Sequence, residues 1–381
     1  MIGRLFDDIR QEDLHQLVEQ SVSEGRSLEF KRELPNGTDA GVKEFLADVT
    51  SLANAQGGDL VFGIEDTGGV ASALTPLAVV DPDAAILRLE NMLRDGVEPR
   101  LANVRSKWIP LASGGGALVL RISSSMAAPH RIKFKNSGRF YARNSRGKYE
   151  MDTHELRAAF NGSEQIPLRL RELHAGAVQF AEGRDMPFQL EPDPSAVVSI
   201  MPLTFLREVR DVQPVFESAL LPPRISGGID YLHTLEGLLV YPPKDDANNV
   251  RSFALTHSSG RIDAAWTFGG TRDIAGGTQS KLVAPRLYRD GVMDVARNGI
   301  GRLRGFGIEG PWVIFVSLMH MNGSTIWFPD NTFSSVAWRD LVTLPEVVSD
   351  TADEQDLKPF FDALLLLFGL KPDSYASLFN Q

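Results

Sequence analysis

Apolar side chains recur at three- and four-residue steps between residues 42 and 53. This spacing predicts an amphipathic helix packed on a core, with a stripe made of Val42, Phe45, Leu46, Val49, Leu52 and Ala53. Gly57 and Gly58 follow the stripe, where a helix commonly ends at a residue that can take a positive φ. Residues 60–64 are then a short apolar run, and residues 66–69, Asp-Thr-Gly-Gly, have the composition of a turn.

A second strand is predicted before this helix, at residues 28–31. Successive side chains of a strand point to opposite faces. Leu28 and Phe30 therefore face the core, while Glu29 and Lys31 share the other face.

Three carboxylates flank these two predicted strands. Glu24 precedes the first strand, Glu29 lies within it, and Asp66 follows the second strand. If the strands are neighbours, the carboxylates and Lys31 converge at one edge of the sheet. Three carboxylates suit a hard divalent cation, and a lysine suits a phosphate. A chance placement stays open, because surface carboxylates are common and an Asp before Thr-Gly-Gly is a frequent turn former. Glu65 is the rival to Asp66, but it is expected on the opposite strand face.

The remaining pattern predicts an α+β protein with two domains. Residues 1–162 form a mixed-sheet domain, residues 163–194 a connector helix and loop, and residues 195–381 a second α/β domain with a terminal helix. A boundary is expected near residues 161–163, between helices at 152–160 and 168–182. The expected strands of the second domain are 196–201, 237–241, 252–257, 261–268 and 312–319, with 281–304 mostly helical.

Composition limits the class of protein. The chain has 381 residues, of which 43% are hydrophobic and 23% charged, as in soluble globular proteins. It contains no cysteine, which excludes disulfides, cysteine-based zinc sites and a cysteine nucleophile. The first residues do not resemble a signal peptide, and no apolar run approaches membrane-spanning length. We therefore expect a cytoplasmic protein with no membrane partner.

The charge is distributed unevenly along the first domain. The net charge is −10, yet residues 99–149 contain no carboxylate. We expect this basic segment to bind a nucleic-acid backbone, through Arg131, Lys133, Lys135, Arg139, Arg143, Arg146 and Lys148. An ordinary solvated face is the alternative. The interleaved Phe134, Phe140 and Tyr141 could stack on bases, but their alternating spacing favours the core. Gly57, Gly58 and Gly63 could likewise cradle phosphate, but glycines more often allow close packing.

Four pieces of the first domain resemble the Schlafen AlbA-type (divergent AAA-4) family over about residues 12–160. They are Glu-x-x-x-x-Glu-Phe-Lys at 24–31, Ala-Asn-x-x-Gly-Gly at 53–58, Leu-Val-Phe-Gly-Ile-Glu-Asp-x-Gly at 60–68, and Tyr-x-Arg-x-x-Ser at 141–145. Asn144 stands where the family usually has glycine. In RNA-cleaving Schlafens the two motif glutamates and the following Asp form a metal-dependent nuclease site. The resemblance therefore implies catalytic roles for Glu24, Glu29, Asp66 and Lys31, with Mg²⁺ or Mn²⁺ held by the three carboxylates.

Three functions remain open. The first is a metal-dependent endoribonuclease acting on structured RNA such as tRNA. The second is a non-catalytic RNA- or DNA-binding regulator or defence-system subunit, and the third is a scaffold that binds a protein partner through residues 195–381. No zinc-hydrolase helix motif or P-loop is present. Related Schlafen cores form a clamp from two lobes, and only one lobe is visible here, so the resemblance also implies a homodimer.

Overall fold

The computed structural model describes residues 1–102, 104–207, 210–223, 227–274, 278–372 and 376–379. The chain divides into two compact units, residues 1–167 with 206–208 and the remainder. Each unit has its own hydrophobic cores. Helices and strands occur in both, which confirms the predicted α+β class.

A four-stranded sheet forms the centre of the N-terminal unit. Its order is β1 (Leu28–Lys31), β2 (Gly58–Phe62), β7 (Gly116–Ile122) and β6 (Val104–Pro110). β1 and β2 are parallel neighbours, with Leu28 opposite Asp59 and Lys31 opposite Phe62, which meets the condition set for the carboxylates to converge. The other two pairings are antiparallel.

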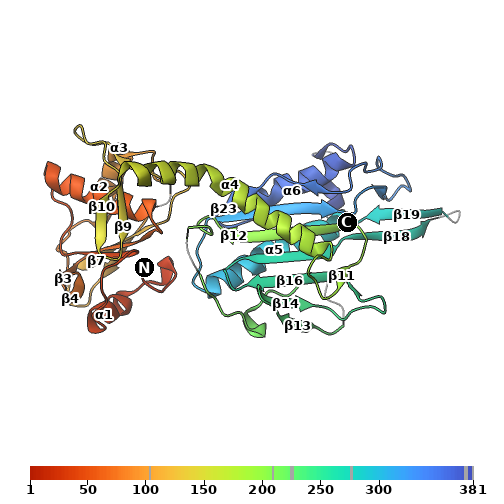
Figure 1. Cartoon of the computed structure of the whole chain (residues 1–381), viewed down its shortest axis with the longest axis horizontal. Coiled ribbons are helices and arrows are strands. Elements are labelled where there is room, and N and C mark those ends of the chain that lie inside the picture. Colours follow the sequence, from red (N-terminus) through yellow and green to blue (C-terminus); the bar gives the residue numbers. More distant parts are fainter. Residues whose placement is uncertain (103, 208–209, 224–226, 275–277, 373–375, 380–381) are drawn as a thin grey trace. The chain divides into compact units, whose positions relative to one another are not determined.

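Both faces of this sheet are covered (Figure 1). The helices α2 (Asp39–Asn54) and α3 (Pro82–Gly96) pack on one face. The helix α1 (Gln11–Glu19) and the hairpin of β3 (Ile64–Thr67) and β4 (Val70–Leu74) pack on the other. Since both faces are buried, β2 and β7 are buried along their whole lengths.

Short elements complete the N-terminal unit. They are η1 (Phe6–Asp8), the pair β5 (Val97–Glu98) with β8 (Arg131–Ile132), and the hairpin of β9 (Tyr141–Asn144) and β10 (Gly147–Glu150). The hairpin packs against α2. The run 60–64, expected as one strand, is divided because Gly63 has a φ of +95°, which ends β2 and lets β3 turn away.

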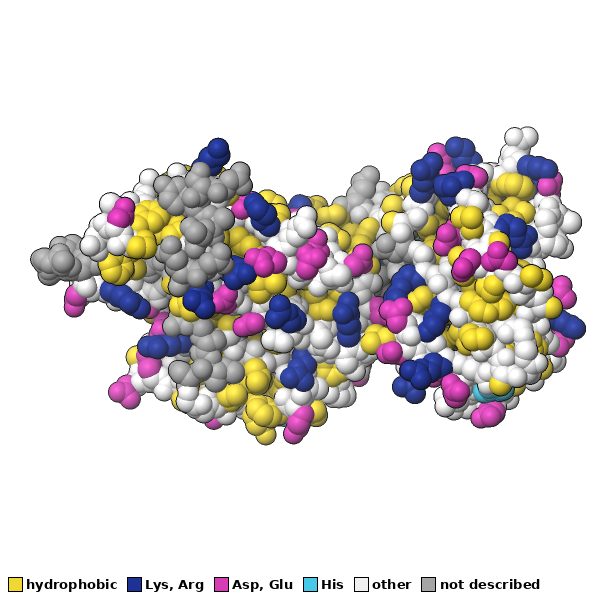
Figure 2. All heavy atoms as spheres, turned by 180° about the vertical axis from the view of Figure 1, so that it is seen from behind, with side chains coloured by type: hydrophobic (Ala, Val, Ile, Leu, Met, Phe, Trp, Pro, Cys, Tyr) yellow, Lys and Arg dark blue, Asp and Glu magenta, His cyan; other side chains and the backbone are white. Residues whose placement is uncertain are grey.

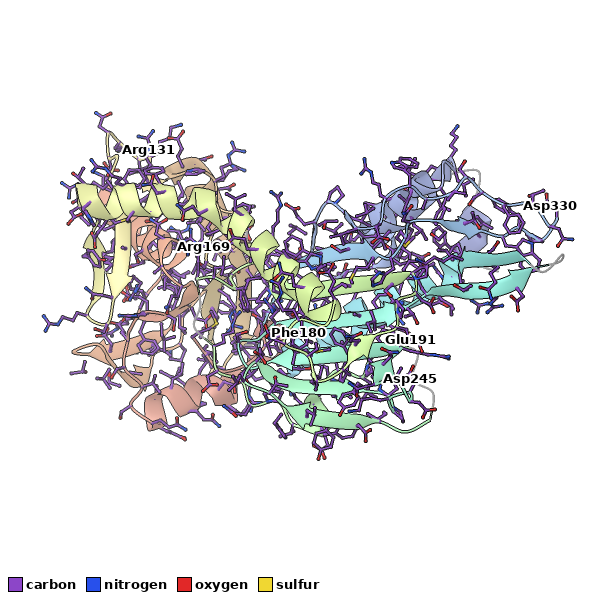
Figure 3. All side chains as sticks on the ribbon, turned by 45° about the vertical axis from the view of Figure 1, so that its right-hand side comes forward. Arg131, Arg169, Phe180, Glu191, Asp245 and Asp330 are labelled. Atoms are coloured by element: carbon purple, nitrogen blue, oxygen red, sulfur yellow. The ribbon has the colours of Figure 1, made fainter. Side chains whose placement is uncertain are left out.

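One helix crosses the division between the units. α4 (Thr153–Ala181) is continuous, so the prediction of two separate helices at 152–160 and 168–182 is wrong, and the boundary expected near residues 161–163 lies within one helix. Pro167 lies inside α4, where its missing N–H removes one helical hydrogen bond. The helix continues because later residues are packed: Leu170, Ala177 and Val178 are all buried. Phe180 packs edge-on against Phe253 (Figure 3).

The C-terminal unit is built on a large antiparallel sheet. Its order is β13 (Asp230–His233), β14 (Gly237–Tyr241), β16 (Ser252–His257), β17 (Ile262–Thr267), β12 (Ser195–Pro202), β20 (Trp312–Met319) and β22 (Val342–Thr343), with β23 (Val347–Ser349) also on β20. The five strands expected from the sequence are present within one residue of their predicted ends. Smaller sheets pair β11 (Gln189–Leu190) with β15 (Asn249–Val250), and join β18 (Gly269–Ile274), β19 (Thr278–Val283) and β21 (Ser324–Ile326).

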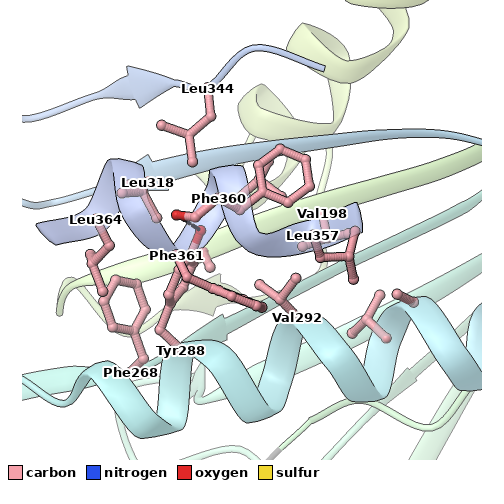
Figure 4. Close-up of a cluster of buried hydrophobic side chains, with 14 of the residues drawn as sticks. Val198, Phe268, Tyr288, Val292, Leu318, Leu344, Leu357, Phe360, Phe361 and Leu364 are labelled. Carbon is pink, nitrogen blue, oxygen red and sulfur yellow. Dashed lines mark hydrogen bonds between the residues drawn. The ribbon is translucent and has the colours of Figure 1, made fainter. Parts of the chain in front are cut away.

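Two helices cover one face of this sheet. α5 (Pro285–Gly305) and α6 (Glu354–Leu367) enclose a cluster that includes Phe268, Val292 and Leu364 (Figure 4). Tyr288 Oη donates a hydrogen bond to the carbonyl of Phe360 at 3.2 Å, which ties the helices together. The short helices η2 (Phe216–Ser218) and η3 (Ala376–Phe379) also belong to this unit. Among the described residues, no helix has the length and apolar character needed to cross a membrane.

Candidate nucleic-acid interface and carboxylate site

Strand β1 presents Glu29 and Lys31 on one face, as its alternating pattern predicts. Lys31 Nζ donates to Glu29 Oε1 at 2.6 Å. The second carboxylate oxygen of Glu29 accepts from the guanidinium of Arg143, which reaches it from β9. Burial disfavours the charged form of Glu29, but Lys31 and Arg143 outweigh burial and hold its pKa below the usual value. Glu29 is therefore a buried carboxylate enclosed by two cations.

Arg143 has a structural role and holds the carboxylate of Glu29. Its side chain is completely buried, and its Nε donates to the carbonyl of Gly25 at 3.2 Å. Sequence reasoning placed Arg143 on a phosphate-binding face. In the structure it points inward, because β9 packs over α2 and brings the guanidinium beside Glu29.

The residue that sequence reasoning missed is Asp48 on α2. It is only 1% exposed, and its Oδ1 accepts from Lys148 Nζ of β10 at 2.6 Å. Its Oδ2 lies 3.4 Å from Lys31 Nζ. Burial raises the pKa of Asp48, while Lys148 and Lys31 act in the opposite direction. A lone acid inside the apolar run Phe45–Ala53 was the available signal.

These ion pairs connect six side chains of alternating charge, which we call the charge chain. Its order is Glu44, Lys148, Asp48, Lys31, Glu29 and Arg143. Burial disfavours the charged form of Lys31, but Asp48 and Glu29 outweigh it and raise its pKa. Glu44 is the exposed end, at 59%, and Arg143 is the buried end.

Glu24 and Asp66 lie beside the charge chain and are not part of it. The turn of the β3–β4 hairpin returns to the start of β1, where Glu24 N donates to the carbonyl of Gly69 at 2.7 Å. Glu24 Oε1 accepts from Phe30 N at 2.8 Å, and Asp66 Oδ2 accepts from Gly69 N at 3.0 Å. Burial raises the pKa of Glu24, and the charges of Glu29 and Asp66 add to that increase. Glu24 and Asp66 are thus both hydrogen-bonded to Gly69, beside the start of β1.

The arrangement of these carboxylates does not fit a divalent ion as it stands. Each oxygen of Glu29 already accepts a bond from a cation and keeps a further lone pair, so an ion at Glu29 would lie beside the positive charge of Lys31 or Arg143. Within the described ranges, no group of three or more His, Asp or Glu side chains is placed to hold a metal. Metal binding by Glu24, Glu29 and Asp66 stays a prediction. Glu65 pairs instead with Arg32 at 3.1 Å.

Most exposed cations of the predicted basic segment are paired with acids. Arg131 (Figure 3) pairs with Glu98 at 2.6 Å, and Lys133 lies 4.0 Å from the same carboxylate. Lys135 pairs with Asp39 at 2.6 Å. Arg139 pairs with Glu150 at 3.0 Å, whereas Arg146 forms no ion pair with any residue that the structure describes. On the face shown in Figure 2, basic side chains are interspersed with acidic ones. The paired cations of this segment therefore have acidic partners from outside residues 99–149.

Phe134, Tyr141 and Gly57 pack as predicted, whereas Phe140 lies outside the core. Phe134 and Tyr141 lie against the core formed by α2 and the sheet, and Phe140 packs edge-on against Phe160. A Cβ at Gly57 would lie 2.6 Å from the carbonyl oxygen of Ile122, so this glycine permits close backbone approach.

Comparisons with known proteins find a family match for part of the chain. Residues 24–152 match the family described as Schlafen, AlbA_2. A search of curated proteins finds no significant match.

Two solved structures are similar to parts of the chain. The crystal structure of the DIP2311 protein from Corynebacterium diphtheriae is 22% identical with a TM-score of 0.25, and the match covers 38% of this chain but only 28% of that protein. The solution structure of the N-terminal domain of an ATP-dependent DNA helicase RecG-related protein from Nitrosomonas europaea is 19% identical with a TM-score of 0.27, covering 34% of this chain and 86% of that domain. Residues 24–152, which contain the entire charge chain, are thus the part of this protein that matches the Schlafen, AlbA_2 family.

Proposed function

We propose that the N-terminal unit binds the phosphate backbone of nucleic acid through residues 131–148. The match to the Schlafen, AlbA_2 family indicates a nucleic-acid-related function. The observation that supports this surface is the exposure of its ion pairs: Lys135 is 60% exposed and its partner Asp39 55%, and Arg139 is 61% exposed and Glu150 50%. Exposed pairs contribute only about 0–1 kcal/mol, so a polyanion can replace the acidic partner at little cost.

The salt dependence of binding tests this proposal. We expect Lys133→Ala/Lys135→Ala to weaken binding of a tRNA hairpin and of duplex DNA alike. The log–log slope against salt should flatten by about 0.7–0.9 per lost phosphate contact. Fluorescence anisotropy between low and moderate salt measures both quantities. Lys358→Ala is the matched control, because Lys358 is 55% exposed and ion-paired in the other unit. An unchanged slope in the double variant would show that residues 131–148 are an ordinary solvated face.

A second candidate function is metal-dependent cleavage of structured RNA such as tRNA, by Glu24, Glu29 and Asp66 with Mg²⁺ or Mn²⁺. The shared contact with Gly69 favours it: Glu24 N donates to the Gly69 carbonyl at 2.7 Å, and Gly69 N donates to Asp66 Oδ2 at 3.0 Å, so these two acids lie at one turn. An ion at Glu29 would have to bind beside the positive charges of Lys31 and Arg143. We expect chelator to abolish cleavage of labelled tRNA, and Glu29→Ala or Asp66→Ala to remove cleavage but retain RNA affinity. Glu65→Ala is the control. A wild type that binds RNA and never cuts it with either metal leaves the binding function alone.

Three expectations stay predictions: the homodimer, the cytoplasmic location and a protein partner of residues 195–381. Light scattering with and without RNA would decide the first of these. A mass equal to one chain under both conditions counts against the dimer.

A further inference from the structure

Two lysines from different elements share one buried carboxylate in the N-terminal unit. Lys148 Nζ lies 2.6 Å from Asp48 Oδ1, and Lys31 Nζ lies 3.4 Å from Asp48 Oδ2. The lysine side chains are 21% and 29% exposed, whereas the carboxylate is 1% exposed. Asp48 thus pairs from below with two ammonium groups that are both partly exposed to solvent.

The bonding of the two lysines leaves capacity for an anion. An ammonium group has three donors. Glu29 is a buried partner of Lys31, while the other partner of Lys148 is Glu44, which is 59% exposed. Oδ2 of Asp48 has no hydrogen-bond partner among the described residues, so among them Glu29 is the hydrogen-bond acceptor of Lys31, and donors of Lys31 remain for an anion. A phosphate oxygen can replace Glu44 on Lys148 without disturbing the buried pairs.

We propose that Lys31 and Lys148, positioned by Asp48, form a phosphate-binding subsite for a backbone phosphate of nucleic acid. The inference rests on the proposed function and specifies where one phosphate binds. Lys31 and Lys148 contact the phosphate. Asp48 does not touch it and is a positioning residue, which fixes both lysines at the surface although its own charge repels the ligand.

Because of this repulsion, the direction in which Asp48→Asn changes anion binding tests the role of Asp48. If Asp48 were only a nearby negative charge, Asp48→Asn would strengthen anion binding by Coulomb's law. If Asp48 positions the lysines, the amide cannot hold two ammonium groups, and anion binding weakens despite the gain in positive charge. The two roles therefore predict opposite changes for one nearly isosteric substitution.

The experiment measures protection of Lys148 from an amine-reactive reagent by mass spectrometry of the full chain. The probes are inorganic pyrophosphate and a short oligoribonucleotide. We expect both to protect Lys148 in the wild type and not Lys358, the exposed control in the other unit. In Asp48→Asn we expect protection at a fixed probe concentration to fall by about threefold, the size of one exposed ionic contact. Circular dichroism confirms that the variant is folded.

The results distinguish the subsite from the proposed function. Protection by pyrophosphate without binding of nucleic acid would retain the subsite and reject the proposed function. Binding of nucleic acid without protection of Lys148 would overturn the subsite and retain the proposed function. Stronger protection in Asp48→Asn would overturn the positioning role of Asp48. Lys148→Ala should flatten the salt slope of RNA binding by about 0.7–0.9, and an unchanged slope would also overturn the subsite.

Discussion

Basic residues within residues 131–148 have different roles, which depend on how deeply each side chain is buried. Arg143 has a fully buried side chain that compensates Glu29, whereas Arg139, four residues earlier, is 61% exposed beside Glu150. A buried charge that loses its partner is costly, while an exposed pair is worth little. Removing Arg143 should therefore lower the free energy of unfolding more than removing Arg139, although both are arginines of the same basic segment.

We predict that Arg143→Ala lowers the free energy of unfolding by about 3 kcal/mol, because it leaves Glu29 with only one of its two cations. Arg139→Ala should change it by less than about 0.5 kcal/mol. Urea unfolding followed by fluorescence measures both variants. Equal effects would contradict the assignment of Arg143 as an internal anchor.

The missed role of Asp48 has a physical reason at this scale. The sequence shows an acid within an apolar helix, but it does not show that β10 returns about a hundred residues later to supply Lys148. Similarly, the absence of acids from residues 99–149 gives no information on Asp39 and Glu98, which neutralise that segment from outside it. The local pattern predicted that Glu29 and Lys31 share a face. Their partners Arg143 and Asp48 lie far away in the sequence, so the local pattern could not predict them.

At the scale of elements, strands were predicted well because each carries its own apolar pattern. β14, β16 and β20 have the predicted ends. α4 was predicted less well, because Gly162 and Pro167 are ordinary signals for an interruption. Packing on both sides of Pro167 overrides that local preference, and no local pattern reveals such packing.

α4 is joined to the large sheet by a buried histidine. His174 Nδ1 lies 2.8 Å from Ser199 Oγ of β12, and its Nε2 lies 2.9 Å from Ser317 Oγ of β20. The ring also stacks on Phe315, with centroids 5.3 Å apart. Burial lowers the pKa of His174 from 6.5 to about 4, with Arg261 acting in the same direction and Asp263 against it. The neutral ring therefore links one helix to two strands.

This histidine makes stability depend on pH in a defined direction. Between about pH 6.5 and pH 4 the unfolded chain binds a proton that the folded chain does not, so the free energy of unfolding falls as pH decreases. The loss is on the order of 3 kcal/mol and is complete below about pH 4. His174→Gln removes this titration, so the wild type should lose about 3 kcal/mol more than the variant between pH 7 and pH 4. Parallel profiles in urea unfolding would refute the account of His174.

At the scale of the whole molecule, a substitution in one unit should speed hydrogen exchange in that unit and not in the other, because the two units have separate cores. Arg143→Ala should speed amide hydrogen exchange in peptides from β1 and β2, and His174→Gln in peptides from β12 and β20. Hydrogen exchange followed by mass spectrometry makes this comparison on the intact chain. If each variant speeds exchange equally in both units, they unfold as one cooperative body.

The most direct test of the central claim is to map where nucleic acid contacts the full chain. Photo-crosslinking of a bound tRNA hairpin, read out by mass spectrometry, should place crosslinks in peptides covering residues 131–148 and 28–31. Crosslinks confined to peptides of residues 210–372 would contradict the account, because the interface would then lie in the C-terminal unit.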